Sequence, residues 1–362
     1  MKFSIVVPVR NGGPAFAQCL EAVQRARVEC ADLVPTELIV VGDGSADDSL
    51  ALARAAGVHV VATTGGRGPA AARNLGARSA TGEIAFFVDA DVALHPDALR
   101  RAAVAFQSDP ELEACFGSYD DAPAAPNFLS QYKNLLHHYV HQHAREEAST
   151  FWTGCGAIRL AAFQALGGFD ELTYRRPSIE DIDLGYRLRR RRGKIRLLKD
   201  MQCAHLKRWT VRSLLTSDIF DRGLPWTVLL WREAQARRAE RANPVLARQP
   251  YQLDLNLQTS NRVCVALTAL LVLSLFTLFF VPPLWPLPIA LAGALLILNR
   301  SLYSFFLQKR GVWFTLAAIL WHWLYYLYNS LSFVLGTFHY FVRGAHRGPV
   351  AADGTLTTAR DA

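Results

Sequence analysis

Residues 263–298 contain no charged side chain, and this stretch divides the chain into two parts suited to different environments. Residues 263–281 are long enough to cross a bilayer as one helix, and Pro282 and Pro283 then interrupt the apolar run. A shorter apolar segment follows over 284–298, and an aromatic-rich stretch without Lys, Arg, Asp or Glu covers 312–342. We therefore expect a transmembrane region over 261–343 made of three or four apolar segments.

Basic residues lie around these apolar segments. The net charge of +8 comes from 39 Lys and Arg against 31 Asp and Glu, and many of the basic residues lie between Arg187 and Arg248. The positive-inside rule then places 232–248 and 300–310 in the cytoplasm. We expect a multi-pass protein of the inner (cytoplasmic) membrane with a basic amphipathic juxtamembrane segment over 216–260 and a disordered tail over 344–362. No nucleic-acid partner is expected, because the basic residues are not mixed with stacking aromatics in a binding module.

The front of the chain alternates short apolar runs with helical patterns. Apolar runs over 4–9, 37–41, 58–62 and 83–88 predict strands, and helices are expected over 15–26, 46–56 and 69–79. Ser45 is placed to cap the second of these helices. This order predicts an α/β fold, a Rossmann-like and mostly parallel sheet with helices on both faces, whose ligands gather at the carboxyl ends of the strands. Residues 1–215 are the expected catalytic domain.

Asp89 and Asp91 follow the fourth predicted strand with one residue between them. Two carboxylates in a loop can reach one ion, and hard oxygen ligands suit Mg²⁺ or Mn²⁺ bridging the phosphates of a nucleotide. The alternative is a polar turn whose aspartates cap the next helix. The position after a buried strand favours the metal site.

Polar residues also follow the other strands. Asp43 ends the second strand in a Gly-Asp-Gly-Ser turn, where its carboxylate can accept hydrogen bonds from a base or ribose. Arg67 and Arg73 lie in a glycine-rich segment and offer forked donors to phosphate or base oxygens, unless they are solvated helix charges. We predict that all three contact a nucleotide.

A second acidic group begins the amphipathic helix expected over 178–192. Glu180 and Asp181 lie at its N-terminus, where the helix dipole favours ionised carboxylates. Ser178 and Asp181 also imitate a capping box, which would serve stability alone. We favour a general base for an acceptor hydroxyl. His205 is a candidate ligand of metal or diphosphate, with a packed histidine as the alternative.

Taken together, these segments resemble the family 2 glycosyltransferases of the GT-A fold. The resemblance covers about residues 1–210 and rests on 4–11, 42–47, 68–76, Asp89-Ala90-Asp91, 167–170 and Glu180-Asp181. Several ordered motifs at family-like spacing are far more specific than any one of them.

The resemblance implies an inverting transfer from a nucleotide diphosphate sugar, a UDP- or GDP-sugar, to an acceptor hydroxyl. It places Pro8 and Asp43 in the nucleoside pocket and Arg73 on the base. We add Arg10, from the turn after the first strand, and Arg67 as candidate nucleotide-sugar contacts. The resemblance also implies that Asp89 and Asp91 manage the metal diphosphate with Mg²⁺ or Mn²⁺, and that Asp181 is the catalytic base. His205 stays a further metal-ligand candidate and Glu180 a further catalytic candidate.

Two departures from the family pattern bear on the substrates. Gly42 stands where the family often has Asp, so one acidic contact to the nucleotide is missing. Residues 205–209 look like the Gln-x-x-Arg-Trp motif of processive synthases, with His205 in place of Gln. We therefore prefer transfer of one sugar at a time to a lipid or other membrane-surface acceptor.

Other functions stay as alternatives. A processive polysaccharide synthase needs enough helices to enclose a channel, and a non-catalytic sugar-nucleotide-binding membrane protein would not need its catalytic carboxylates. A dinucleotide-binding oxidoreductase would carry G-x-G-x-x-G after the first strand, where this chain has Arg10-Asn11-Gly12-Gly13-Pro14.

Overall fold

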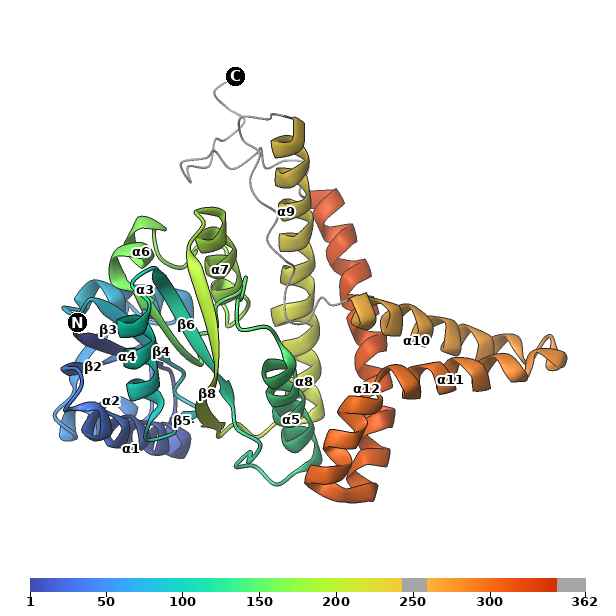
Figure 1. The fold of residues 1–362 in the computed structure, drawn as a ribbon, viewed down its shortest axis with the longest axis horizontal. Coiled ribbons are helices and arrows are strands. Elements are labelled where there is room, and N and C mark those ends of the chain that lie inside the picture. The colour runs from blue at the N-terminus through green and yellow to red at the C-terminus, as the bar shows by residue number, and fades with distance from the viewer. Residues whose placement is uncertain (243–258, 344–362) are drawn as a thin grey trace. The chain divides into compact units, whose positions relative to one another are not determined.

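A computed structural model describes residues 1–242 and 259–343 and divides the chain into two compact units (Figure 1). The first unit contains Met1–Val211 and Ser301–Thr315, and the second contains the described parts of Arg212–Arg300 and the chain from Leu316. The expected disordered tail over 344–362 and part of the juxtamembrane segment over 216–260 lie outside the described residues.

The first unit is built on one sheet, with eight strands among the described residues, in the order β3-β2-β1-β4-β7-β6-β8-β5. The strands are β1 (Phe3–Val9), β2 (Thr36–Gly42), β3 (His59–Ala62), β4 (Ile84–Val88), β5 (Val92–Leu94), β6 (Leu112–Tyr119), β7 (Cys155–Arg159) and β8 (Lys194–His205). The helices between them are α1 (Gly13–Cys30), α2 (Ser49–Ala55), α3 (Pro69–Ser79), α4 (Ala98–Ser108), α5 (Phe128–His143), α6 (Leu160–Ala165) and α7 (Glu180–Arg190).

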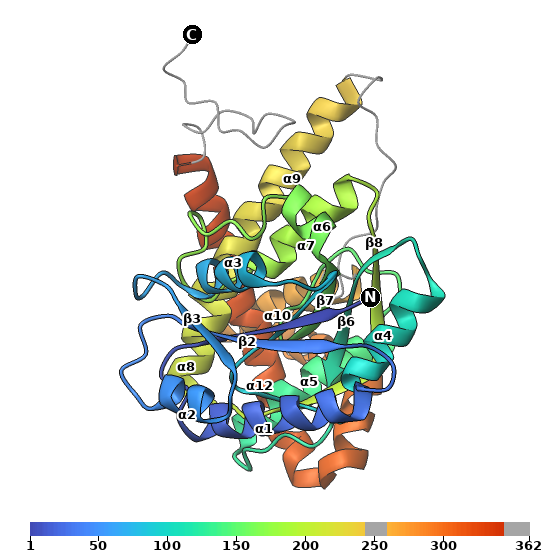
Figure 2. The same ribbon diagram turned by 90° about the vertical axis from the view of Figure 1, so that its left-hand side faces the viewer.

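Helices cover both faces of this sheet because successive side chains of a buried strand point to opposite faces. Phe86 and Val88 of β4 pack in the same core as α1 and α4, whereas Phe87 packs in the core of α3, α6 and α7. Figure 2 shows the two helical layers on either side of the sheet. The predicted α/β fold with helices on both faces is confirmed.

The sheet is more mixed than the sequence predicts. The strands β3, β2, β1 and β4 pair in parallel, as expected, and β6 pairs in parallel with β8. Strand β7 is antiparallel to both β4 and β6, and β5 is antiparallel to β8. The reversal begins after β4, where the chain leaves the regular strand–helix alternation.

Two predicted helix starts are wrong. Helix α2 begins at Ser49, and the Ser45 hydroxyl instead donates to the Val9 carbonyl and accepts from the Asn11 amide, at 3.2 and 3.1 Å. Helix α7 begins at Glu180, so Ile179 and not Ser178 occupies its N-cap position.

Residues 301–315 belong to the first unit although they come late in the chain. The buried Phe306 ring lies 5.9 Å from the ring of Tyr132 on α5. Arg310 donates to the side chain of Gln131 at 2.7 Å and to the Asp121 carbonyl at 2.8 Å. This basic segment therefore lies on the same side of any membrane as the sheet.

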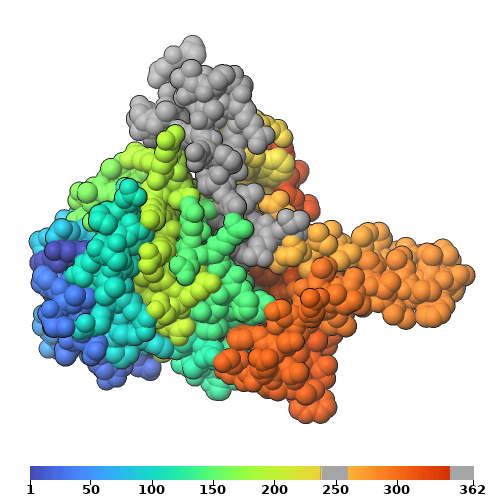
Figure 3. All heavy atoms as spheres, in the orientation of Figure 1, coloured from blue at the N-terminus to red at the C-terminus, as the bar shows by residue number. Residues whose placement is uncertain are grey.

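The second unit is helical. Helix α8 (Val211–Thr216) runs into it, and the unit holds the π-helix over Ser217–Gly223, α9 (Leu224–Ala242), α10 (Thr259–Thr277), the 3₁₀ turn Pro282–Leu284 and α11 (Pro286–Leu298). Helix α12 (Arg300–Arg343) starts at the end of this unit and bends at Gly311, whose φ is 78°. Helices α10 and α11 pack together as a hairpin (Figure 3), and Phe279, Phe280 and Trp285 at its tip are exposed.

By length and composition, the described residues contain one helix that could cross a membrane, over Ser260–Thr277. A second span results if the bent pair Pro282–Leu298 and Arg300–Val342 counts as one. The structure therefore gives one or two candidate spans instead of the three or four apolar segments expected, because the apolar residues after 282 lie on helices bent by 67°. One or two such helices are a weak indication of a membrane.

Candidate active site

Polar side chains gather at the carboxyl ends of β1, β2, β3 and β4. These four strands are parallel, so the loops after Val9, Gly42, Ala62 and Val88 all leave one edge of the sheet. This is the edge at which open α/β sheets bind their ligands.

Asp43, directly after β2, organises the loop before α3. Its buried carboxylate accepts hydrogen bonds from the Thr63 hydroxyl at 2.6 Å and from the backbone amides of Arg67 and Gly68, both at 2.8 Å. A carboxylate has about four lone-pair sites, and these three bonds occupy most of them. Asp43 therefore has a structural role in this loop, in addition to the nucleoside contact that is predicted for it.

The residues after β1 face the same loop. Pro8 is half-buried and pairs with Val41 of β2, and Arg10 is exposed. The Arg10 guanidinium lies 3.9 Å from the point where a Cβ on Gly66 would be. Asn11, with φ of 51°, accepts from the Ala46 amide at 2.7 Å, which holds the first two loops together. Pro8, Arg10 and Asp43 therefore lie around one loop edge.

Replacing Gly68 with Ala is expected to destabilise this site. Gly68 has φ of 92°, and a Cβ on it would lie 2.2 Å from the Arg175 carbonyl oxygen, so backbone must move. Gly57→Ala is the matched control, because Gly57 has φ of 69° but nothing within 4 Å of its Cβ position. We expect the control to lose about 1 kcal/mol from backbone strain and Gly68→Ala to lose clearly more. Equal losses of unfolding free energy in chemical denaturation would contradict this close approach.

Arg73 of α3 joins two carboxylates from distant parts of the chain. Its guanidinium donates to Asp89 Oδ1 at 2.6 Å and to Glu180 Oε1 at 2.7 Å. The side chains of Arg73 and Glu180 are each 5% exposed. Burial alone would lower the pKa of Arg73, but the charges of Asp89 and Glu180 outweigh burial and raise it, so the guanidinium stays charged. Arg73 thus fixes the second acidic group against the β4 loop.

Asp181, the next residue after Glu180, has the properties of a base. Burial raises the pKa of Asp181, and the charge of Glu180 raises it further. Arg73 and the Thr153 amide lower it in part, which leaves a pKa of about 6. The Thr153 amide donates to Asp181 Oδ2 at 3.2 Å, and the Ile182 amide donates to Oδ1 at 2.8 Å. A carboxylate with a pKa near 6 is ionised at neutral pH and still basic enough to take a proton.

Asp91 and His205 come together because β5 pairs with the end of β8. Val92 lies opposite His205 in that pairing, and the Leu206 amide donates to the Asp91 carbonyl at 2.8 Å. Asp91 Oδ2 lies 3.7 Å from His205 Nε2, with side-chain exposures of 36% and 8%. Burial would raise the pKa of Asp91, but His205 and the Lys207 charge lower it to about 2, which favours the anion.

These residues fit an ion that takes its other ligands from a substrate. Among the described residues, no group of three His, Cys, Asp or Glu side chains could hold a metal. Mg²⁺ is commonly held by one or two carboxylates together with substrate phosphates and water. Asp91 and His205 could supply two ligands, whereas Asp89 faces Arg73.

A family model described as "Glycosyl transferase family 2" matches residues 4–167, which include the first three loops, Asp89 and Asp91. This part of the chain belongs to glycosyl transferase family 2. The family 2 domain thus holds the Asp43 and Arg73 sites, while Glu180, Asp181 and His205 follow it in the chain.

Individual relatives match more weakly. The chain is 32% identical over 99 residues to the uncharacterized glycosyltransferase YibD of Escherichia coli (strain K12), covering 26% of this chain and 27% of the relative. It is 27% identical over 231 residues to the pre-mycofactocin glycosyltransferase of Mycobacterium tuberculosis (strain H37Rv), covering 61% and 46%. The chain therefore spans less than half the length of the curated relatives it matches.

Solved structures are similar at low identity. The mannosyltransferase PcManGT from Pyrobaculum calidifontis in complex with GDP-Man and Mn²⁺ is 18% identical with a TM-score of 0.49, covering 92% of this chain and 86% of that one. TarS 1-349 of S. aureus in complex with UDP-GlcNAc is 20% identical with a TM-score of 0.44, covering 58% and 60%. Such scores are too low to transfer a binding site.

The structure shows contacts around the candidate site that the sequence did not indicate. Thr63 and Thr153 bond Asp43 and Asp181, and the Tyr119 ring stacks on His205 with centroids 4.4 Å apart. No motif marks these residues, because each contact depends on how the strands pair. Arg67 is also placed differently from Arg73: its guanidinium faces Glu171 at 3.8 Å and not the buried carboxylates.

Proposed function

We propose that the chain is an inverting glycosyltransferase that moves a sugar from a nucleotide diphosphate sugar to an acceptor hydroxyl. The observation that carries this is Asp181, a carboxylate with a pKa of about 6, held beside the Asp89–Arg73–Glu180 ion bridge at the ligand-binding edge. Family 2 membership of residues 4–167 supplies the reaction class. Carboxyl groups with strongly shifted pKa values cluster at functional sites, which supports a catalytic role for Asp181.

In the proposed reaction, Asp181 takes the proton of the acceptor hydroxyl as that oxygen attacks the anomeric carbon. The bond between the anomeric carbon and the diphosphate oxygen breaks, and the nucleotide diphosphate leaves from the opposite face with its electron pair. The configuration is therefore inverted. Arg73 positions Glu180 and Asp89. The nucleotide would be contacted by Pro8, Arg10, Asp43 and Arg67. Positioning and a nearby base are the main sources of rate in such a step.

We propose Mg²⁺ or Mn²⁺ as the cofactor, with Asp91 and His205 as its protein ligands and Asp89 beside them. A divalent ion there would neutralise charge on the departing diphosphate. The donor is proposed to be a UDP- or GDP-sugar.

Removal of the metal is expected to abolish transfer. EDTA should stop the release of nucleotide diphosphate, and added Mn²⁺ should restore it. Asp91→Asn should weaken Mn²⁺ binding, followed by electron paramagnetic resonance, because an amide is a poorer ligand than a carboxylate. Asp97→Asn is the control, since Asp97 pairs with Arg101 on α4. Unchanged Mn²⁺ binding by Asp91→Asn would overturn this assignment.

We propose that the enzyme works at the inner membrane, anchored by more than one pass, with its catalytic unit in the cytoplasm and a lipid or other membrane-surface acceptor. The exposed apolar hairpin α10–α11 supports membrane contact. Lys309 pairs with Asp121 and Arg310 bonds Gln131, so the basic 301–315 segment and the catalytic unit share one side. The positive-inside rule makes that side cytoplasmic.

Transfer of one sugar at a time is proposed because His205 replaces the glutamine of the processive motif and contacts Asp91. The first test is release of nucleotide diphosphate from a panel of UDP- and GDP-sugars by the detergent-solubilised protein. The proposal requires one donor to be consumed far faster than the others. Release from none of them would reject a transferase.

A further inference from the structure

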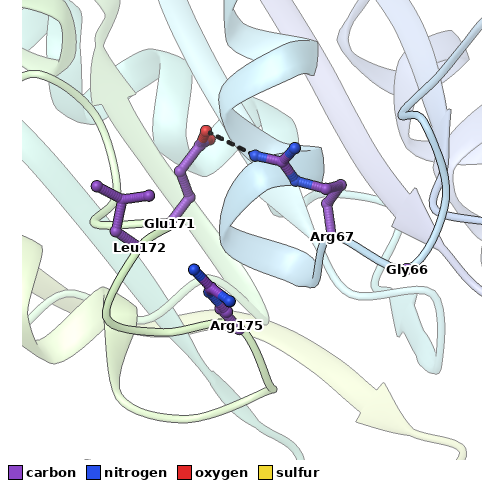
Figure 4. Close-up of a pocket in the computed structure, with 5 residues that line it drawn as sticks. All are labelled: Gly66, Arg67, Glu171, Leu172 and Arg175. Atoms are coloured by element: carbon purple, nitrogen blue, oxygen red, sulfur yellow. Dashed lines mark ion pairs between the residues drawn. The ribbon is translucent and has the colours of Figure 1, made fainter.

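A pocket of about 290 Å³ lies between the loop before α3 and the loop before α7. It is lined by Gly66 and Arg67 from the first loop and by Glu171, Leu172 and Arg175 from the second (Figure 4). Arg175 was not singled out by any motif, and the transfer reaction proposed above does not use it.

The two loops are held rigidly against each other. The backbone of Arg175 touches Gly68, because a Cβ on Gly68 would lie 2.2 Å from the Arg175 carbonyl oxygen. The Asn74 amide donates to the Phe169 carbonyl at 2.9 Å and to Glu171 at 3.0 Å, and it accepts from the Phe169 amide at 2.9 Å. On the other side, Asp43 holds the amides of Arg67 and Gly68. The pocket therefore has fixed walls.

Positive charge exceeds negative charge in this pocket. Two arginines line it, and Glu171 is the one lining carboxylate among the described residues. Glu171 is shared, since it also accepts from Asn74, and its distance of 3.8 Å from Arg67 makes a weak pair. Within 1–242 and 259–343, the Arg175 guanidinium has no hydrogen-bond or ion-pair partner. Figure 4 shows it beside the ion pair of Arg67 and Glu171.

We propose that this pocket is an anion subsite in which Arg67 and Arg175 bind phosphate or carboxylate oxygens of a substrate. An arginine fork matches such oxygens with two parallel hydrogen bonds. The subsite rests on the proposed function for its ligand, which is either the diphosphate of the donor or an anionic group on the acceptor. Glu180 and Asp181 begin the helix that follows the Arg175 loop, so the proposed base comes six residues after Arg175 in the chain.

The test compares Arg175→Gln with Arg54→Gln in the full chain. Arg54 is an exposed arginine in the last turn of α2 and serves as the matched control. Inorganic phosphate and pyrophosphate are titrated by calorimetry, with melting temperatures measured alongside. We expect Arg175→Gln to weaken binding of one of these anions about 10-fold or more, and Arg54→Gln to leave it unchanged. Arg175→Lys, which keeps charge but not the fork, should fall between. Equal binding by all variants would overturn the subsite.

Two further measurements show whether the donor or the acceptor supplies the bound anion. If the donor supplies the anion, Arg175→Gln weakens binding of uridine or guanosine diphosphate about 10-fold but not of the matching nucleoside. If the acceptor supplies it, diphosphate binding and donor hydrolysis stay normal while the KM for the acceptor rises. If the unchanged protein transfers no sugar but Arg175→Gln still loses phosphate binding, the subsite stands and the transferase is rejected. If the unchanged protein transfers sugar but Arg175→Gln has normal KM values and normal phosphate binding, the transferase stands and the subsite is rejected.

Discussion

Asp181→Asn is expected to lower the rate of sugar transfer about 10²- to 10⁴-fold, the usual contribution of a general base. An amide cannot take the proton of the acceptor hydroxyl, although it occupies nearly the same volume as the carboxylate. The effect should appear in kcat measured with saturating donor, while binding of the nucleotide diphosphate stays close to that of the unchanged protein.

The Asn variant should stay folded. The pKa of Asp181 is raised from its ordinary value to about 6, so its contribution to stability is complete below pH about 4 and is lost as the pH rises through 6. At neutral pH the charge therefore opposes folding, and its removal offsets the loss of one hydrogen bond. Asp183→Asn, on the same helix, is the control: Asp183 pairs with Arg187 at 2.8 Å, and its loss should leave transfer intact. Full activity in Asp181→Asn would show that Asp181 is not the catalytic base.

The same residue sets the expected pH dependence. Because Asp181 must be ionised to act, kcat/KM should rise tenfold per pH unit below about 6 and level off above it. The profile is measured on the protein with an uncharged acceptor, so that no substrate group titrates in this range.

Arg73→Met is expected to produce the largest loss of stability. It leaves the Glu180 carboxylate buried, with the hydrogen bond that it accepts from the Ser178 amide at 2.9 Å, and it removes the ion pair of Asp89 as well. Breaking a buried ion pair from one side costs about 3–5 kcal/mol. For a unit of this size that corresponds to a fall of about 10 °C in Tm, measured by calorimetry.

A double variant shows whether the unpaired Glu180 charge causes the loss of stability in Arg73→Met. Adding Glu180→Gln to Arg73→Met removes that charge and should recover at least about 1 kcal/mol, a coupling typical of residues in contact. The control is Arg25→Met, because Arg25 and Glu21 form an exposed pair worth less than about 1 kcal/mol. If Arg73→Met were no more destabilising than Arg25→Met, the ion bridge would have no structural role.

Much of the front of the chain could be predicted from its sequence. The first four strands and α3 follow from apolar runs of strand length, from proline at the helix start and from glycine-rich turns, all of which act locally. The meeting of Asp43 with the loop before α3 also follows, because parallel neighbouring strands end at one edge.

Contacts that depend on the second half of the sheet could not be predicted. Nothing local to His205 says that β5 and β8 pair antiparallel and bring it to Asp91. Likewise, Arg73 and Glu180 are 107 residues apart, and their contact requires α7 to pack on the same face as α3. The basic segment 300–310 lies between apolar stretches in the sequence, yet its Phe306 ring packs against Tyr132 of α5.

The central claim is tested most directly by the product of the reaction. The detergent-solubilised full chain and its Asp181→Asn variant are incubated with UDP- and GDP-sugars, Mn²⁺ and a bacterial lipid extract. The masses of the products are then measured by mass spectrometry. The account predicts a lipid that gains the mass of one sugar with the unchanged protein and no such product with the variant. Equal product from both proteins, or consumption of no donor by either, would contradict it.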